Sequence, residues 1–265
     1  MFSPIFINGT TLNDAYFNAL WQLWYHGKDY KITEGSFKGN FRREFDFCSG
    51  VIIHPHDRPL APIMPNNIDP VTTDEAIDQY FANYLMNSKL EPNEEYRYSS
   101  WINGADNYYK YRYIQKEIKK ENMFEESFEY NKETPIEWVI RHFQEKGYGN
   151  NHCYINIGNS DSNFAYDKKY NNEAERGTSP CLRGIDFKIK ENKLITSVIF
   201  RSWDLYSGFP ENLGGITLLN EYVAAQLPGV EPGPLAFTSM GLHCYDFQLK
   251  MVVMALQRDR EQLIS

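Results

Sequence analysis

The chain has 265 residues, of which 42% are hydrophobic and 23% charged, so it can bury a sizeable core and is not disordered as a whole. Its formal net charge of −8 disfavours nucleic acid as a partner, because a negative surface repels phosphate backbones. A small basic pocket for a mononucleotide still fits inside an acidic protein. The four cysteines are far apart and form no Cys-x-x-Cys pair, which argues against structural zinc and against a disulfide scaffold.

No segment has the pattern of a targeting or membrane sequence. The first residues, MFSPIFINGTT, lack a basic stretch, and nowhere does the chain approach about 18 consecutive apolar residues. We therefore expect no signal peptide, no membrane partner and a cytoplasmic location.

The first half of the chain predicts mainly helices. Apolar residues recur at helical spacing over residues 10–26, where either of two threonines can cap the helix. Residues 41–53 alternate like a strand, whereas five prolines make residues 55–70 an irregular loop. Further helices are predicted over residues 74–86, 106–120 and 134–146, the last beginning with a Thr-Pro pair.

The second half is rich in predicted strands. These cover residues 153–157, 181–189, 193–202 and 234–238. The pair Glu191-Asn192 predicts a hairpin turn between the second and third of them. Helices are predicted over residues 213–226 and 247–263, and the polar residues 159–178 predict a surface excursion. Because no repeat or linker divides the chain, we expect one domain over residues 1–265.

Four short motifs follow one another in this half. They are Ser179-Pro180-Cys181, Arg201-Ser202-Trp203-Asp204, Gly208-Phe209-Pro210-Glu211-Asn212 and Leu242-His243-Cys244-Tyr245. In order and spacing they resemble the thymidylate synthase family, with its Pro-Cys nucleophile and its Arg-Ser-x-Asp, Gly-x-Pro-x-Asn and His-x-Tyr runs. The match extends from about Ser179 to Asp246. The N-terminal half is more divergent, and its segments around Arg42-Arg43-Glu44 and Tyr96–Trp101 look like the archaeal-type branch.

The resemblance implies a one-carbon transfer to C5 of a pyrimidine nucleotide. C5 of uracil is a poor nucleophile until a thiolate adds to C6, and Cys181 would be that nucleophile. Arg183 or Arg201 near the sulfur would favour the thiolate. Tyr98 would lie near C5 and help to remove its proton. The alternative for an isolated cysteine is a small buried hydrophobic residue.

The same resemblance assigns the substrate-binding residues. Arg201 and Ser202 would bind the phosphate, since a guanidinium fork and a hydroxyl suit a dianion. Asn212 would read uracil O4 and N3–H with its amide, although it is also a plausible helix N-cap before Leu213. His243 and Tyr245 face one way along an extended segment and would bind the deoxyribose 3′-hydroxyl.

The implied second substrate is 5,10-methylenetetrahydrofolate, and no metal is expected. Asp204 would hydrogen-bond the pterin, and Trp101 or Trp203 would cover the folate. The family also uses a carboxylate from the N-terminal half as general acid. Asp78 is our candidate for it, with Glu75 as substitute, and both equally suit a solvated helix face.

Three features depart from the family. Its bacterial-type members lend the partner subunit an Arg-Arg pair for the phosphate, where this chain reads Gly149-Asn150-Asn151-His152. Asn151 and its neighbours, or Arg42 and Arg43, would then bind the phosphate, or it is held more weakly. The usual Pro-Pro-Cys is Ser179-Pro180-Cys181, and residues 262–265 lack the apolar tail that closes over folate in many relatives.

Taken with the resemblance, the chain is expected to have an α+β fold with a large bent mixed sheet flanked by helices, paired sheet to sheet in a homodimer. The expected reaction converts dUMP to dTMP. Hydroxymethylation of dUMP, dCMP or CMP through the same adduct is the alternative. A non-catalytic nucleotide-binding relative and an acyl-transferring thiol enzyme are the other interpretations.

Overall fold

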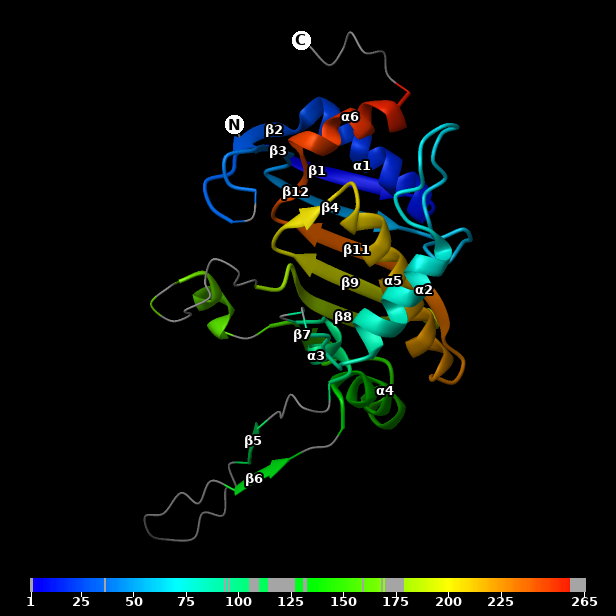
Figure 1. Ribbon diagram of the computed structural model, residues 1–265. Helices are drawn as coiled ribbons and strands as arrows, with labels where there is room; N and C mark the ends of the chain where they lie inside the picture. The colour runs from blue at the N-terminus through cyan, green and yellow to red at the C-terminus, as the bar shows by residue number, and fades with distance from the viewer. Residues whose placement is uncertain are drawn as a thin grey trace.

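The computed structural model describes residues 2–35, 37–92, 94, 96–104, 110–113, 127–130, 133–158, 160–167, 169 and 179–257 (Figure 1). Helices and mixed sheets alternate along these residues, so the predicted α+β class is confirmed. In this part of the chain, no helix combines the length and the apolar character that a bilayer span needs.

The largest sheet has six strands in the order β1-β4-β11-β9-β8-β7. Their bounds are β1 (Pro4–Gly9), β4 (Phe47–Ile52), β7 (Tyr154–Asn156), β8 (Leu182–Lys190), β9 (Lys193–Phe200) and β11 (Glu231–Ser239). The pairs β1–β4 and β11–β9 are parallel and the others antiparallel, so the sheet is mixed. On β4, β9 and β11 every second side chain is buried and the intervening ones are partly exposed.

Two long helices contact this sheet. Helix α1 (Leu12–His26) packs on β1, and α5 (Gly208–Ala225) packs on β9 and β11 (Figure 1). Helix α2 (Asp74–Tyr80) and the π-helical turn η1 (Phe81–Met86) pack in turn on α5. The contact is close because α5 carries two glycines there: a Cβ at Gly215 would come within 2.5 Å of the Tyr80 ring.

A second sheet carries most of the motif residues. Its order is β10-β12-β3-β2, with β2 (Lys28–Lys31), β3 (Phe41–Glu44), β10 (Trp203–Asp204) and β12 (Leu242–Tyr245). Helix α6 (Asp246–Ala255) follows β12 directly. The remaining elements are α3 (Ser99–Ile102), α4 (Pro135–Lys146), η2 (Ser160–Tyr166) and the hairpin of β5 (Lys110–Tyr113) and β6 (Ser127–Tyr130).

Several local predictions are confirmed. Thr11 and Thr134 each accept from the backbone three residues on, in capping boxes that start α1 and α4. The turn between β8 and β9 has Glu191 at φ 51° and Asn192 at φ 59°, the positive values that a tight hairpin requires.

Other predictions are wrong. Residues 41–53 form two strands of different sheets, because Phe45 turns into the core and bonds to Leu242. Of the predicted helix 106–120, residues 110–113 are a strand, and the rest lies outside the described residues. Helix α5 begins at Gly208 with Ser207 as N-cap residue, so Asn212 lies inside the helix and does not cap it. Strands β1 and β2 and helix α3 were not expected.

Two predicted segments are described only in part. Residues 160–166 of the polar excursion form the 3₁₀ helix η2, while most of residues 168–178 lie outside the description. The last helix is seen as α6, and residues 258–265 are likewise not described.

Asn220 ties α5 to the main sheet. Its amide nitrogen donates to the Leu194 carbonyl at 2.6 Å and the Thr196 hydroxyl at 2.8 Å, and its oxygen accepts from Gly233 N. We predict that Asn220→Ala lowers the free energy of unfolding by about 2–4 kcal/mol, because the buried partners lose their bonds. Urea denaturation measures this, with the exposed Asn66→Ala as control, expected within about 0.5 kcal/mol of the parent. Equal stability of the two variants would contradict the stabilising role of the Asn220 hydrogen bonds.

Candidate active site

The four motifs meet at one end of the main sheet. Leu182 on β8 pairs with Phe200 on β9, and Phe200 pairs with Ser239 on β11. The residues just beyond this row are Cys181, Arg201 and the turn into β12. Arg201 N donates to the Cys181 carbonyl at 2.9 Å, which places the first two motifs side by side.

The Arg201 side chain fixes the backbone that leads to Cys181. Its Nε donates to the Pro180 carbonyl at 3.0 Å and its Nη2 to the Ser179 carbonyl at 2.6 Å. The same Nη2 lies 2.7 Å from the hydroxyl of Tyr166 on η2. Arg183 donates to the Ser179 hydroxyl at 3.1 Å. Two guanidinium groups therefore surround the short segment that carries the thiol.

Burial and charge oppose each other at Cys181, whose side chain is partly exposed. Loss of water raises the pKa of the thiol, and Arg201 and Arg183 lower it by less, so the net direction is upward. Both arginines are thus near enough to the sulfur to act on its charge. They do not make the free protein's thiol a ready thiolate, and its ionised fraction grows as pH rises.

Tyrosines gather beside the thiol. The Tyr98 hydroxyl accepts from Leu182 N at 3.3 Å, next to Cys181 in sequence, and Tyr98 is 6% exposed. The rings of Tyr84 and Tyr96 lie 5.3 and 5.9 Å from that of Tyr98. Burial raises the pKa of all three phenols, to about 12 for Tyr84, and a charge on Cys181 raises each further. The phenols therefore stay protonated at neutral pH and can donate hydrogen bonds.

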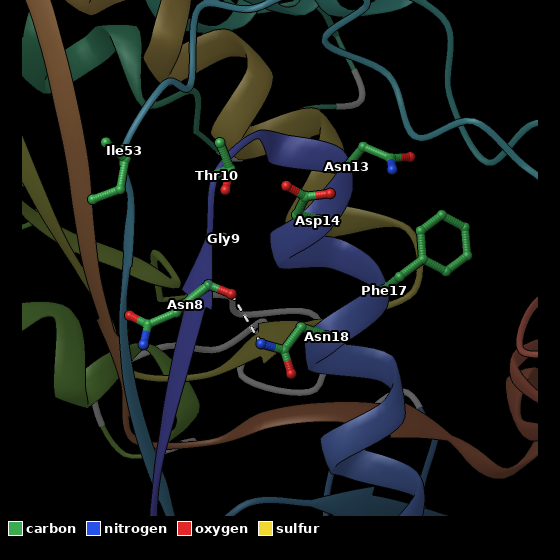
Figure 2. A pocket seen from close by; sticks show the side chains of 8 residues that line it. All are labelled: Asn8, Gly9, Thr10, Asn13, Asp14, Phe17, Asn18 and Ile53. Carbon is green, nitrogen blue, oxygen red and sulfur yellow. Dashed lines mark hydrogen bonds between the residues drawn. The ribbon is translucent and has the colours of Figure 1, made fainter.

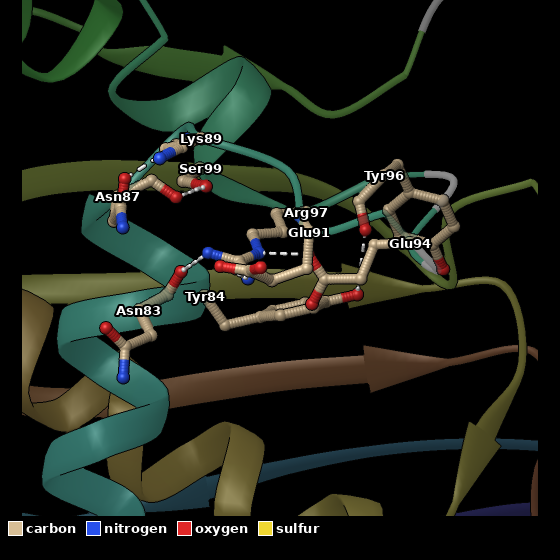
Figure 3. Close-up of polar contacts among 9 residues, drawn as sticks. All are labelled: Asn83, Tyr84, Asn87, Lys89, Glu91, Glu94, Tyr96, Arg97 and Ser99. Atoms are coloured by element: carbon tan, nitrogen blue, oxygen red, sulfur yellow. Dashed lines mark hydrogen bonds and ion pairs between the residues drawn. The ribbon is translucent and has the colours of Figure 1, made fainter.

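A network of polar contacts positions these tyrosines (Figure 3). The buried Arg97 forms an ion pair with Glu94 and donates to the Asn83 carbonyl at 2.9 Å. Ser99 donates to the carbonyl of Asn87 at 2.7 Å, so side chains satisfy carbonyl groups at the end of η1. The segment that carries Tyr96 and Tyr98 is thereby fastened to the turn that carries Tyr84.

Asn212 is held from two sides. The Trp203 indole N–H donates to its Oδ1 at 2.9 Å, and its Nδ2 donates to the Tyr80 hydroxyl at 2.9 Å. An indole nitrogen can only donate, so this contact sets which way the amide faces. One N–H and one lone pair of Asn212 remain for a ligand. Trp203 is buried and its ring stacks on that of Phe200 at 3.8 Å, so it positions Asn212. The expectation that Trp203 covers the folate is therefore wrong.

His243 presents a buried nitrogen without a partner. Its Nδ1 lies 2.9 Å from the Gly241 carbonyl, while Nε2 has no hydrogen bond within the described residues. Burial lowers the pKa of the imidazole, so the neutral ring is favoured. The ring lies edge-on to Tyr245 at 4.8 Å, so the two side chains adjoin as predicted.

The two arginines of β3 have different surroundings. Arg42 pairs in register with Tyr245 and lies 2.6 Å from Glu44, so it borders the His243–Tyr245 strand. Arg43 instead donates to Asp29 at 2.8 and 3.1 Å and lies over the Trp24 ring. The structure thus places Arg42 near the motif residues and directs Arg43 away from them.

Asp204 is supported by α6 and by its own turn. Gln248 donates to both carboxylate oxygens at 3.2 Å, and Tyr206 N donates to Oδ1 at 3.0 Å. Ser202 is partly exposed beside it in the chain, and Trp101 is partly exposed with its ring 5.9 Å from that of Tyr96.

Some expected site residues lie apart from this cluster. Asp78 and Glu75 are exposed on α2. Asn151 and His152 are exposed after α4, and His152 contacts His142 at 3.1 Å. In the described part of the chain, none of these side chains forms a hydrogen bond or ion pair with the four motifs. Asn151 was expected to act across a dimer, which one chain does not display.

The sequence reasoning overlooked several residues of the cluster. Tyr80 and Tyr84 lie in the predicted helix 74–86, where their i, i+4 spacing is that of any helix face and gives no sign of the site. Tyr166 fell in the segment taken as a polar excursion. Glu211 was read only as the variable position of its motif.

A separate shallow pocket of about 560 Å³ lies between the start of α1 and the ends of β1 and β4 (Figure 2). It is lined by Asn8, Gly9, Thr10, Asn13, Asp14, Phe17, Asn18 and Ile53. Ile53 follows β4 at the end opposite Cys48, whereas Cys48 pairs with Ser239 near Cys181. The pocket is therefore at the far end of the sheet from the thiol.

Comparison with known proteins agrees with this arrangement. Residues 164–265 match the family described as thymidylate synthase. Proteins named "Putative thymidylate synthase" from Methanosarcina acetivorans and Methanosarcina mazei are 28% and 27% identical, each over 93% of this chain and 92% of the relative. One of that name from Methanosarcina barkeri is 40% identical over 28% of this chain and 33% of its own length.

The fold and the motif cluster thus fit a one-carbon transferase acting on a pyrimidine nucleotide. The predicted resemblance of this chain to the thymidylate synthase family is confirmed by the match of residues 164–265 and by the archaeal relatives. Within the described residues, no group of three or more His, Cys, Asp or Glu side chains is arranged to hold a metal ion.

The pKa of Cys181 predicts the pH dependence of its alkylation. Iodoacetamide should modify Cys181 slowly at pH 7, with a rate that rises throughout pH 7–9, because burial holds the thiol protonated. Arg201→Gln should slow the reaction by about threefold to tenfold, since one pKa unit changes the thiolate fraction tenfold. Mass spectrometry of the Cys181 peptide measures the rate, with the exposed Arg141→Gln as control. A rate independent of pH would contradict this.

Proposed function

We propose that this protein is a thymidylate synthase, which transfers the one-carbon unit of 5,10-methylenetetrahydrofolate to C5 of dUMP. The observation that carries the proposal is the position of the Cys181 thiol, which lies among two arginines and the protonated phenols. A nucleophile for C6, an anion-binding guanidinium and proton donors are thus present in one place. The extended family resemblance supports the same reaction.

The proposed dUMP contacts use the groups that the protein leaves free. The phosphate binds Arg201 and Ser202, with Arg42 in support, and displaces the Tyr166 hydroxyl from Arg201. His243 Nε2, which bonds to none of the described residues, accepts from the 3′-hydroxyl, beside Tyr245. We keep Asn151 as a phosphate contact from a second subunit.

For the base, the remaining N–H of Asn212 donates to uracil O4 and its oxygen accepts from N3–H. Cytosine offers an amino group and an unprotonated N3 at these positions, so both contacts fail. This complementarity is our reason to prefer dUMP over dCMP or CMP.

The chemistry begins when Cys181 adds to C6, which moves electron density through C5 to O4. C5 then attacks the methylene carbon of the folate substrate, and Tyr98 helps to remove the C5 proton through bound water. Asp204 hydrogen-bonds the pterin, and Trp101 lines the folate. Elimination of tetrahydrofolate leaves an exocyclic methylene on C5. Hydride transfer from the tetrahydrofolate to this methylene and departure of the Cys181 sulfur from C6, which restores the C5=C6 double bond, yield dTMP and dihydrofolate. Capture of water instead gives the hydroxymethyl nucleotide, which the product assay below distinguishes.

We also propose a single domain that forms a homodimer. One buried cluster joins residues from Ile7 to Ala255, which supports one domain over residues 1–265. Alternate side chains on β4, β9 and β11, such as Val51 and Ile199, are partly exposed on one face of the main sheet. Pairing of two such faces gives the sheet-to-sheet arrangement and a symmetric interface.

The product of the reaction tests the proposed activity. The protein with dUMP and methylenetetrahydrofolate should yield dTMP by mass spectrometry and an equal amount of dihydrofolate by absorbance. Cys181→Ser should lower the rate by at least about 10⁴-fold and leave dUMP binding within about threefold, because only the nucleophile is lost. Cys153 is a buried cysteine directly before β7. Its variant Cys153→Ser is the control and should stay active. A parent protein inactive on dUMP, dCMP and CMP would contradict the proposal.

The base contact predicts a change of specificity. Asn212→Asp should lower kcat/KM for dUMP by at least about 10²-fold and raise it for dCMP, since a carboxylate repels O4 and pairs with an amino group. The carboxylate can still accept from the Trp203 indole, so the site stays assembled. Paired kinetics on the two nucleotides measure the change. An unchanged preference for dUMP over dCMP would contradict the proposed contact between Asn212 and the base.

A further inference from the structure

Glu211 lies beside the residues that hold Asn212. It precedes Asn212 in the chain and is one turn before Gly215, against which the Tyr80 ring packs. The Tyr80 hydroxyl accepts from Asn212 Nδ2, and Glu211 is near enough to raise the pKa of that phenol. The carboxylate therefore lies on the side of α5 that faces α2 and the Tyr80–Asn212 contact.

The carboxylate is half-buried and unpaired. Across the described residues, no hydrogen bond or ion pair involves the Glu211 side chain. Loss of water alone raises its pKa, without an opposing cation. A partly buried acid that no basic group neutralises has little structural benefit, whereas a proton donor needs this environment.

The other carboxylates near the site are engaged. Asp204 accepts from Gln248 and Tyr206, and Glu44 forms an ion pair with Arg42. Asp78, the expected general acid, is exposed on α2. Burial raises the pKa of Glu44 as well, but the Arg42 guanidinium opposes this shift, whereas no cation among the described residues opposes the shift of Glu211.

Resting on the proposed function, we infer that Glu211 is the general acid that protonates O4 of the bound pyrimidine, directly or through one water. As the sulfur electron pair of Cys181 forms the bond to C6, the C5=C6 pair moves to C4–C5 and the C4=O4 pair moves to O4. O4 takes the proton of Glu211, which becomes a carboxylate. When C5 attacks the one-carbon donor, the O4–H bond breaks, C4=O4 reforms and the proton returns to Glu211.

Among the described residues, the titratable group that interacts with Glu211 is Tyr80. Tyr80 projects from α2, with Tyr84 of η1 stacked on it at 5.3 Å. Both phenols have raised pKa values and remain neutral over the pH range of interest. In a plot of kcat against pH, Glu211 should therefore contribute one alkaline limb. As the pH rises, Glu211 loses its proton and kcat falls.

The test compares Glu211→Gln with the parent protein. We measure dUMP affinity by calorimetry, release of tritium from [5-³H]dUMP, and kcat over pH 5.5–9. Glu211→Gln should bind dUMP within about threefold of the parent and lose about 10²–10³-fold in kcat and in tritium release. The alkaline limb assigned to Glu211 should vanish from its residual pH profile. Glu231→Gln, at an exposed carboxylate paired with Lys193, is the matched control and should stay at parental activity.

The outcomes separate this assignment from the proposed function. Glu211→Gln with full turnover, or with an unchanged pH profile, would overturn the assignment while the parent's activity still supports the function. A loss of turnover in Asp78→Asn in place of Glu211→Gln would likewise overturn it. A parent protein that releases no tritium and forms no product would overturn both.

Discussion

The site depends on the contacts that Arg201 makes with the backbone before Cys181. Two carbonyl groups, of Ser179 and Pro180, accept from this one guanidinium, and the Arg201 backbone bonds back to Cys181. The reactive sulfur is thereby fixed at the end of β8, beside a cation that remains partly exposed to a ligand. Because the same side chain holds this segment and is the proposed phosphate ligand, our proposal couples nucleotide binding to the position of the nucleophile. The raised pKa of Cys181 fits a thiol that is held ready and ionises as the reaction begins.

A second set of contacts joins the base-reading amide to the acid beside it. Close packing of α2 on α5 is possible because Gly215 has no side chain, and it brings Tyr80 within reach of Asn212. Trp203 completes the arrangement from the core side, since its indole fixes the amide's direction. The same packing shelters Glu211 from water. One helix contact therefore positions both the amide proposed to recognise the base and the carboxyl group proposed to protonate it.

The family resemblance of the motifs implied that Cys181, Arg201 and Asn212 belong to one site, and the structure brings Cys181 and Arg201 side by side at adjacent strand ends. Local capping signals likewise predicted the starts of α1 and α4. The break of residues 41–53 into two strands was not predictable from alternation, since it depends on the pairing of β3 with β12 in another sheet. The exposure of Asp78 and the shelter of Glu211 follow from how α2 and α5 pack, which no single motif encodes. Tertiary contacts, and not local pattern, determine which of these acids is sheltered.

The central claim is that Cys181 forms a covalent bond to C6 of a pyrimidine nucleotide. The most direct measurement uses 5-fluoro-dUMP with methylenetetrahydrofolate, because fluorine at C5 cannot leave as a proton does and the adduct accumulates. Mass spectrometry of the digested protein should show the peptide that contains Cys181 carrying both nucleotide and folate. A peptide that stays unmodified at saturating concentrations, in protein shown by calorimetry to bind the nucleotide, would contradict the account.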